Sequence, residues 1–368
     1  MKDLAAWLTL RHCPRLGTIG IHNLLLHFGD AKAVCNAARS DLQTFNLSTS
    51  SIDFLKSTAL SPSVEKELIW AEQAGNRILV CTDAEYPPLL KSIHSAPALL
   101  YVQGQISVLR ELQLAMVGSR NPSAGGVENA FQFARHLAAS GLVITSGLAV
   151  GIDAASHRGA LAAHGATIAV MATGIDKVYP AEHLGLVEQI LQRGAIVTEF
   201  PLGTPPLPEH FPQRNRIISG LSAGTLVVEA ALRSGSLITA RHALEQSREV
   251  FAIPGSIHNP HAKGCHQLIR QGAKLVESSG DILEELAPQL RTALNAAEPS
   301  SQSHENTISG LSEDYQQLLE AMGHDPITID NLSLRSQMPP EAVSSMLLIL
   351  ELQGYIASQA DGRYSRIS

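Results

Sequence analysis

The spacing of apolar residues changes along the chain and divides it into regions of different structure. Up to about residue 76, apolar side chains such as Leu4, Trp7 and Leu8 recur three and four residues apart, which is the period of an amphipathic helix. From residue 77 to about 287, short runs rich in Val and Ile alternate with helical patterns. We therefore predict a helical domain over residues 1–76 and an α/β domain over residues 77–287.

The central region contains short apolar runs, most of which end in Gly, Ser or Pro. They are Ile78–Cys81, Ala98–Val102, Leu112–Val117, Leu142–Thr145, Thr167–Ala172, Ala195–Glu199, Thr225–Val228 and Val250–Ile253. Strands that alternate with helices build a mostly parallel sheet that helices cover on both faces. Ligands of such sheets bind beyond the carboxyl ends of the strands, which is where the glycines of this region lie.

The last eighty residues change character once more. Residues 288–310 contain proline and a polar Ser-rich stretch without periodicity, so we expect a linker there. Residues 311–368 show helical patterns near 313–322, 328–335 and 340–353, followed by two short apolar segments around Asp361-Gly362. Because Asp-Gly between such segments is a hairpin signal, the region predicts a winged helix.

The last helical pattern of the predicted winged helix is acidic. It carries Glu341 and Glu351 but no Lys or Arg. Since a winged helix on DNA needs cations for the phosphates, we favour a protein partner over DNA for this domain.

A glycine-containing turn stands inside the N-terminal region. Leu16-Gly17-Thr18-Ile19-Gly20 leads into a helical pattern that ends before Gly29. The turn resembles a helix-hairpin-helix element that binds a DNA backbone, but an ordinary turn in a small helical domain explains it equally well.

Two Gly-rich segments of the central region stand where a strand ends and a helix begins. In Val117-Gly118-Ser119-Arg120, the glycine allows a tight turn, the following helix N-terminus can bind an anion, and the arginine adds a phosphate ligand. An ordinary turn explains Gly118 but not Arg120. The second segment holds Gly147 and Gly151.

Two charged residues follow the second Gly-rich segment. We expect the carboxylate of Asp153 to interact favourably with the partial positive charge at the start of the following helix, rather than to take part in catalysis. Arg158 lies further along that helix, where it either approaches the phosphate bound at the Gly-rich segment or belongs to a solvent-exposed face.

Three further segments add cations and helix starts. Arg214 and Arg216 flank Asn215, and both arginines can bind phosphate oxygens or pair with the protein's own carboxylates. Further along the chain come Gly235 and Ser236 with Arg241, and then Pro254-Gly255-Ser256 with Lys263 and Gly264.

Residues 214–274 are basic although the chain is acidic. The segment holds eight Lys or Arg and three Glu, a formal net charge of +5, against −7 for the chain. Several phosphate sites along one face fit a phosphate polymer better than a single nucleotide. Because aromatic residues make up only 4% of the chain, we expect phosphate contacts to dominate over base stacking, with Phe211 and Tyr179 as the nearest stacking candidates.

Several classes of site find no support in the sequence. The Gly-x-Gly-x-x-Gly spacing of dinucleotide sites, the ATP-binding P-loop and the His-Glu-x-x-His zinc motif do not occur, and Ser119 and Ser146 lack a nucleophile-elbow setting. The four cysteines have no metal-ligand spacing. We therefore expect no catalytic residues, no metal and no cofactor, in a cytoplasmic protein without a membrane span.

Five segments of the central region, taken in order, resemble the DprA/Smf family of DNA-processing proteins. They are Val117–Arg120, Ser146–Asp153, Phe211–Ser222, Ser234–Ala240 and Ile253–Ser256. The resemblance implies an extended Rossmann fold between a helical domain of the SAM or helix-hairpin-helix type and a winged helix. It also implies a homodimer that binds and protects incoming single-stranded DNA in natural transformation, displaces single-strand-binding protein and loads RecA recombinase, without being an enzyme.

The resemblance also suggests which residues contact DNA. By motif it places Arg120, Arg214, Asn215, Arg216, Gly235, Ser236 and the Gly147/Gly151 loop in a DNA groove. To these the residues themselves add Gly118, Ser119, Arg158, Lys177, Arg241, Lys263 and Gly264. The chain departs from the family at His183, where an Asn is usual after the Gly174–Pro180 segment, and Lys177 can substitute for a contact there.

One class of enzyme is the alternative. Nucleoside-monophosphate phosphoribohydrolases of the lysine-decarboxylase-like group share a related fold and a Pro-Gly-Gly-x-Gly-Thr…Glu motif. Here Gly224-Thr225 and Glu229 are present, but Pro-Gly-Gly is missing.

Overall fold

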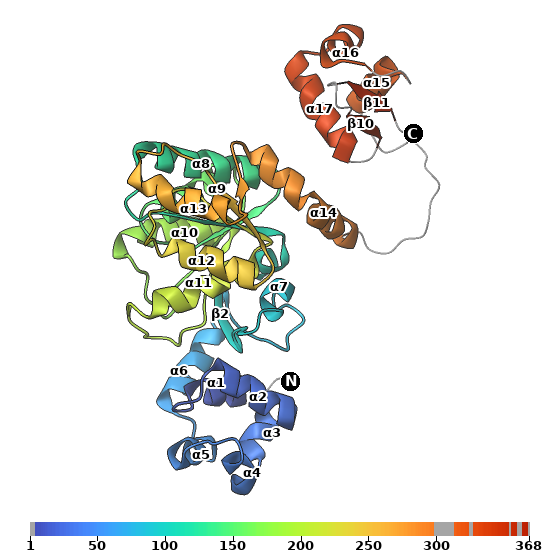
Figure 1. Cartoon of the computed structure of the whole chain (residues 1–368). Coiled ribbons are helices and arrows are strands. Elements are labelled where there is room, and N and C mark those ends of the chain that lie inside the picture. Colours follow the sequence, from blue (N-terminus) through green and yellow to red (C-terminus); the bar gives the residue numbers. More distant parts are fainter. Residues whose placement is uncertain (1–3, 298–312, 324–326, 353–354, 359–362, 367–368) are drawn as a thin grey trace. The chain divides into compact units, whose positions relative to one another are not determined.

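The computed structural model describes residues 4–297, 313–323, 327–352, 355–358 and 363–366. The chain divides into two units, Met1–Glu298 and Pro299–Ser368, each with its own core (Figure 1). None of the described helices is long and apolar enough to cross a membrane.

A nine-stranded sheet forms the centre of the first unit, in the order β1-β2-β6-β5-β4-β3-β7-β8-β9. Its strands are β1 (Asn76–Val80), β2 (Leu99–Gly104), β3 (Gln113–Val117), β4 (Val143–Ser146), β5 (Thr167–Val170), β6 (Ala195–Thr198), β7 (Gly224–Val227), β8 (Glu249–Ala252) and β9 (Lys274–Leu275). Strands β3 to β9 pair in parallel, whereas β2 is antiparallel to both β1 and β6. The predicted α/β fold is confirmed; only β9, with two residues, has no counterpart among the predicted apolar runs.

Alternating residues of the strands bury opposite faces of the sheet. In β3, Leu114 and Met116 belong to one hydrophobic cluster, and Ala115 and Val117 belong to the other. Helices cover both faces: α8 (Ala124–Ala139), α9 (Ile152–Ala162) and α10 (Leu184–Arg193) on one, and α11 (His210–Leu221), α12 (Ser236–Glu245) and α13 (Lys263–Arg270) on the other. This explains why the strands are continuous apolar runs without alternation.

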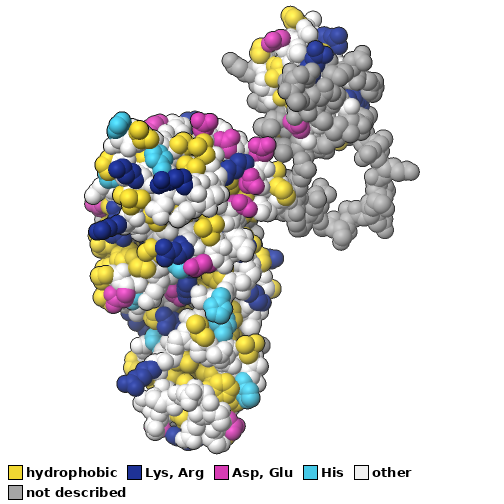
Figure 2. Space-filling view, viewed as in Figure 1, with side chains coloured by type: hydrophobic (Ala, Val, Ile, Leu, Met, Phe, Trp, Pro, Cys, Tyr) yellow, Lys and Arg dark blue, Asp and Glu magenta, His cyan; other side chains and the backbone are white. Residues whose placement is uncertain are grey.

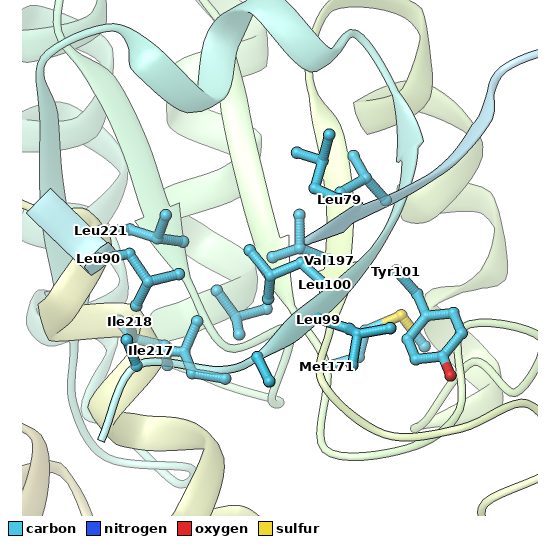
Figure 3. Close-up of a cluster of buried hydrophobic side chains, with 14 of the residues drawn as sticks. Leu79, Leu90, Leu99, Leu100, Tyr101, Met171, Val197, Ile217, Ile218 and Leu221 are labelled. Carbon is cyan, nitrogen blue, oxygen red and sulfur yellow. The ribbon is translucent and has the colours of Figure 1, made fainter. Parts of the chain in front are cut away.

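Helix α11 is fixed by an apolar contact at the edge of the sheet. Figure 3 shows Ile218 and Leu221 of α11 beside Leu90 of the short helix α7 (Pro88–Lys91), next to Leu99 and Leu100 of β2. All five side chains are at most 1% exposed. The rigid position of α11 matters because this helix carries three of the predicted DNA ligands.

The N-terminal helices share the core of the central sheet. They are α1 (Leu4–His12), α2 (Thr18–Phe28), α3 (Ala31–Asn36), α4 (Arg39–Gln43), α5 (Thr49–Leu55) and α6 (Pro62–Ala71). The buried carboxylate of Glu67 joins the two parts: it accepts a hydrogen bond from Tyr101 Oη at 2.9 Å and one from the Leu202 N–H at 3.2 Å, and it lies 2.9 Å from His12 Nε2. The boundary predicted at residue 76 therefore separates two element types within a single unit.

The N-terminal turn predicted from its glycines lies between α1 and α2. Gly17 is the N-cap of α2, and Gly29, at a φ of 90°, ends it. Whether this hairpin binds a DNA backbone stays a prediction.

The linker predicted at 288–310 overlaps a helix. Helix α14 runs from Ser279 to Ala297 with Pro288 inside it. Ile282 and Leu286 are completely buried and anchor its first turns, so the helix continues although the proline removes one backbone hydrogen bond. Residues 298–310 lie outside the described residues.

The second unit has the elements of the predicted winged helix. Helices α15 (Glu313–Met322), α16 (Ile329–Ser336) and α17 (Pro340–Leu352) precede the antiparallel pair β10 (Ile356–Ser358) and β11 (Tyr364–Arg366). Leu318, Leu332 and Leu347 form its fully buried core. The predicted Asp361-Gly362 turn lies outside the described residues.

A completely buried histidine makes the first unit sensitive to acid. Thr167 Oγ1 donates a hydrogen bond to the Ile144 carbonyl, so it accepts one from His157 Nδ1 at 2.7 Å. The other ring nitrogen, Nε2, is buried without a hydrogen-bond partner among the described residues. Burial lowers the pKa of His157 from 6.5 to about 3, with a smaller contribution from His183 and Arg214.

We therefore expect His157 to weaken folding below pH 6.5, because the unfolded chain then binds a proton that the folded chain rejects. The contribution reaches about 1.4 kcal/mol per pH unit between the two pKa values. His157→Asn keeps a donor for Thr167 and removes the titrating group. Urea unfolding at pH 7.5, 6 and 5 should show the wild type losing stability faster than the variant, and parallel losses would contradict this assignment.

Candidate nucleic-acid interface

A cleft of about 770 Å³ opens at the carboxyl ends of the parallel strands. Strand β3 pairs with β4 on one side and β7 on the other, so the chain winds in opposite directions from this point. In doubly wound sheets, ligands bind at such a switch point. The cleft is lined by the loop after β3, the loop after β7 and the first turns of α11 and α12.

One side of the cleft combines a cation with two aromatic rings. The guanidinium of the exposed Arg120 lies 5.1 Å from the centre of the Phe211 ring. The Tyr179 ring meets the Phe211 ring edge-on, with centroids 5.8 Å apart. A hollow of about 90 Å³ adjoins this group and is lined by all three residues. The arrangement offers an arginine for a phosphate and ring faces for a base.

That phosphate contacts dominate over base stacking stays a prediction, and the structure locates the two stacking candidates. Aromatic residues are scarce in the chain, but two of them lie together where the cleft opens. A composition counts residues without locating them, and 32 positions separate Tyr179 from Phe211 along the chain. The balance between stacking and phosphate contacts therefore depends on this pair.

Arg214 forms the buried floor of the cleft. It is 3% exposed, and its Nη1 donates to the Gly147 carbonyl at 2.5 Å and to the Val170 carbonyl. Burial lowers its pKa from the ordinary arginine value to about 10, an effect that the carboxylate of Asp153 opposes, so the side chain stays charged at neutral pH. Arg214 thus holds α11 to the ends of β4 and β5. A loss of DNA binding on its substitution would not identify a DNA contact, because the cleft itself would be altered.

Asp153 occupies the backbone donors of the second Gly-rich segment. Its Oδ2 accepts from the Gly147 N–H at 3.1 Å and from the Ala149 N–H at 3.3 Å. Burial raises the pKa of this carboxyl, while Arg214 and the two N–H groups lower it. Gly147 has to be glycine, because a Cβ there would lie 2.5 Å from Arg214 Nη1 and 2.7 Å from Asp153 Oδ2.

The first Gly-rich segment is likewise bound by internal acceptors. The Ser119 N–H donates to the Glu229 carbonyl at 2.7 Å, and the Ser123 N–H donates to Glu229 Oε2 at 2.8 Å. A Cβ on Gly118 would lie 2.6 Å from Ile152 Cγ1, so this glycine permits the close approach of α9. Gly118, Ser119 and Arg120 all line the cleft, but the two serine N–H groups bind the protein itself.

The remaining predicted ligands on α11 and α12 divide between cleft and scaffold. Arg216 forms an ion pair with Glu199 at 2.6 Å, with both side chains mostly buried, and does not line the cleft. Asn215 lines it and donates to the Gly235 carbonyl at 3.4 Å. Gly235 and Ser236 also line it, although the Ser236 hydroxyl pairs with Ser234 at 2.7 Å.

The other predicted ligands lie outside the cleft. The buried Gly264 donates its N–H to the Ala230 carbonyl at 2.7 Å, and the exposed Lys263 lines a separate groove. Three predicted cations are exposed but do not line the cleft: Arg158, Lys177 and Arg241. Gly151 does not line it either, and a Cβ there would collide with the Ser119 carbonyl oxygen, so this glycine permits a close approach of two backbone segments.

His183, where the chain departs from the family pattern, is 4% exposed, and its Nδ1 lies 2.8 Å from the Leu148 carbonyl oxygen. It therefore holds the Gly-rich loop rather than facing a ligand.

Sequence reasoning missed one cation and two organising acids. Arg233 lines the cleft and is exposed, within the segment that the charge count had marked as basic. Asp153 and Glu229 were considered only as a helix-start residue and as a motif remnant. Glu229 is 5% exposed and accepts hydrogen bonds from Ser123 and Asn259, so its carboxylate is not a free base in the cleft. This position does not favour the phosphoribohydrolase alternative, which depends on Glu229 as a motif residue.

Comparison with known proteins agrees with this fold. The model of the family DNA recombination-mediator protein A matches residues 77–287, and the DprA winged helix domain matches residues 302–362. Protein Smf of Escherichia coli K12 is 45% identical over 306 residues, which cover 83% of this chain and 81% of that protein.

Two solved structures extend the comparison. DprA from Streptococcus pneumoniae matches with a TM-score of 0.69 and 36% sequence identity. The match covers 77% of this chain and 99% of the chain of that structure. DprA from Helicobacter pylori, whose structure describes its single-stranded DNA binding mode, matches with a TM-score of 0.51 and 28% sequence identity. This match covers 55% of this chain and 93% of the chain of that structure. The chain therefore belongs to the DNA recombination-mediator protein A family, that of the DprA and Smf proteins.

Proposed function

We propose that this protein binds single-stranded DNA in the cleft at the switch point of its sheet and acts as a recombination mediator without catalysis. The observation that carries the proposal is the Arg120 guanidinium held over Phe211 beside Tyr179. Arg233 adds a second exposed cation to the same cleft. The single-stranded DNA binding of the Helicobacter pylori relative supports it.

The arrangement of these groups favours a single strand over a duplex. A duplex buries the faces of its bases in the stack, whereas a single strand can place a base against an aromatic ring and a phosphate against the neighbouring arginine. The rings of Tyr179 and Phe211 are therefore of use only to unpaired DNA. From the family resemblance we add the role of this binding, which is to hold the incoming strand in the cytoplasm during natural transformation.

A groove on the first unit is suited to self-association, and we propose that the protein is a homodimer. Leu232, Ile257 and Leu275, which are 53%, 73% and 43% exposed, line it together with Lys263 and Arg270. Figure 2 shows Lys and Arg side chains interspersed with hydrophobic ones over the face that carries α11, α12 and α13. Clustered exposed apolar side chains of this kind mark interaction surfaces.

RecA recombinase is the partner that we propose for the DNA-bound protein, with displacement of single-strand-binding protein. The family resemblance supports this role. The acidic last helix of the winged-helix unit favours a protein over DNA as the partner of that unit.

Separate variants should distinguish phosphate contact from base stacking. Arg120→Ala should weaken binding of an oligo(dT) strand and reduce the slope of log affinity against log salt by about 0.7, the value for one phosphate contact on a single strand. Phe211→Leu should weaken binding by about 5- to 150-fold, the effect of one stacked base, with the slope unchanged. Fluorescence anisotropy across a salt series measures both.

Arg158→Ala is the matched control, because this exposed arginine lies outside the cleft, and its affinity should stay within about twofold of the wild type. Equal affinity of the wild type for duplex and single strand, or full affinity in both cleft variants, would refute the proposed site.

Self-association should depend on the exposed apolar groove. Ile257→Glu places a charge in it and should shift the protein from dimer to monomer in sedimentation velocity, since a buried unpaired charge costs several kcal/mol. Leu26→Glu is the control, because Leu26 is 86% exposed on α2, outside this groove. A wild type that is monomeric at micromolar concentration would exclude the dimer.

RecA contact should be detectable by co-purification. The full chain on single-stranded DNA should retain RecA, and a chain that ends at residue 310 shows whether the winged-helix unit contributes. Absence of RecA from both preparations would rule out the proposed partner.

A further inference from the structure

The N-terminus of α8 is an anion position that the protein fills with its own carboxylate. Helix α8 follows β3, the place at which a Rossmann fold binds a nucleotide phosphate on the helix N-terminus. Here Glu229 Oε2 accepts from the Ser123 N–H at 2.8 Å and lies 3.3 Å from the Ser123 hydroxyl. A Cβ on Gly126, in the first turn, would collide with this carboxylate. The glycine therefore makes room for an internal acid rather than for a ligand.

The carboxylate is held from its other side as well. Glu229 Oε1 accepts from Asn259 Nδ2 at 3.1 Å, and Asn259 Oδ1 in turn accepts from the His261 N–H at 2.9 Å. With both oxygens bonded and the residue 5% exposed, the side chain has one position. It places a full negative charge against the partial positive charge of the helix end.

The neighbouring crossover repeats the arrangement. Helix α9 follows β4, and the N–H groups of Gly147 and Ala149 before it are taken by Asp153 Oδ2. The turns that follow β3 and β4 are thus both closed by internal acids. The cleft cations that remain for a ligand, Arg120 and Arg233, belong to side chains.

We propose that Glu229 determines the specificity of the cleft: its carboxylate excludes the terminal phosphate of a nucleotide from the α8 N-terminus and reserves the site for internal phosphodiesters of a DNA strand. A terminal phosphate carries up to two charges, whereas a phosphodiester carries one, so repulsion by the carboxylate acts most strongly on nucleotides and 5′-phosphate ends. This inference rests on the proposed DNA-binding function.

Competition binding tests the proposal on the wild-type protein. An internally labelled oligo(dT) with a 5′-hydroxyl should bind, a 5′-phosphate on the same strand should change its affinity by less than about twofold, and millimolar AMP should not displace it. Failure of the 5′-hydroxyl strand to bind would count against the DNA-binding function itself. Displacement by AMP, or a clear gain from the 5′-phosphate, would overturn the role of Glu229 alone.

Removing the charge should weaken the repulsion that a terminal phosphate meets at this helix end. Glu229→Gln keeps the shape and an acceptor for the Ser123 N–H, and it should raise the affinity for AMP by at least about tenfold while the 5′-hydroxyl strand changes little. Glu249→Gln is the matched control, because Glu249 is an exposed glutamate at the amino end of β8, away from the cleft. It should leave AMP binding unchanged.

The exchange Glu229→Gln with Asn259→Asp provides a second variant. The new amide can donate to the new carboxylate, which still accepts from the His261 N–H, so the local bonding is restored while the charge moves from residue 229 to residue 259. Thermal melting shows which variants are folded. A folded Glu229→Gln variant that gains no affinity for AMP would overturn the proposal.

Discussion

The cleft depends on one buried cation. Arg214 extends from α11 under the sheet edge and donates to carbonyl groups at the ends of β4 and β5, with Asp153 as the nearby countercharge. A buried guanidinium is tolerated only where its donors are satisfied and a negative charge is near. The loop after β4, the first turn of α9 and the position of α11 follow from this one requirement, and Gly147 is glycine because the guanidinium and the carboxylate leave no room for a Cβ.

The charge of the site is arranged in two layers. In the inner layer, the carboxylates of Asp153 and Glu229 accept hydrogen bonds from backbone N–H groups that could otherwise bind an anionic ligand. Outside, Arg120 and Arg233 remain exposed on the cleft. A ligand therefore meets side-chain cations and aromatic rings. That surface suits a flexible chain of single charges better than a compact nucleotide.

The helical N-terminal region contributes to this architecture through polar contacts at the cleft side of the sheet. Arg11 of α1 donates to the carbonyl of Glu199, whose carboxylate pairs with Arg216 of α11. Glu67 of α6 holds Tyr101 and the backbone of Leu202. The segment between β6 and α11 is thus fixed from both sides, which positions the helix that carries Phe211 and Asn215.

The types of the elements, their order and the family follow from the residue pattern alone. Apolar runs and periodicity depend on local burial, so they located eight strands and the three helices of the winged-helix unit to within a few residues. Glycine-rich turns between strand and helix likewise marked Gly118 and Arg120 as part of the cleft, where the structure places them.

Which charges face the cleft depends on how folding arranges remote segments. Arg214, Asn215 and Arg216 look equivalent along the chain, yet they end in different surroundings. Arg214 is buried because folding brings the carbonyl groups of Gly147 and Val170 beside it, whereas Asn215 lines the cleft and Arg216 pairs with Glu199. Tyr179 and Phe211 meet edge-on for the same reason. Glu229 likewise accepts from the N–H of Ser123, the N-cap of α8, which lies 106 positions before it. The local pattern of residues indicates which positions are buried and where turns occur. The pairing of charges depends on distances between remote segments, and a local pattern holds no information about those distances.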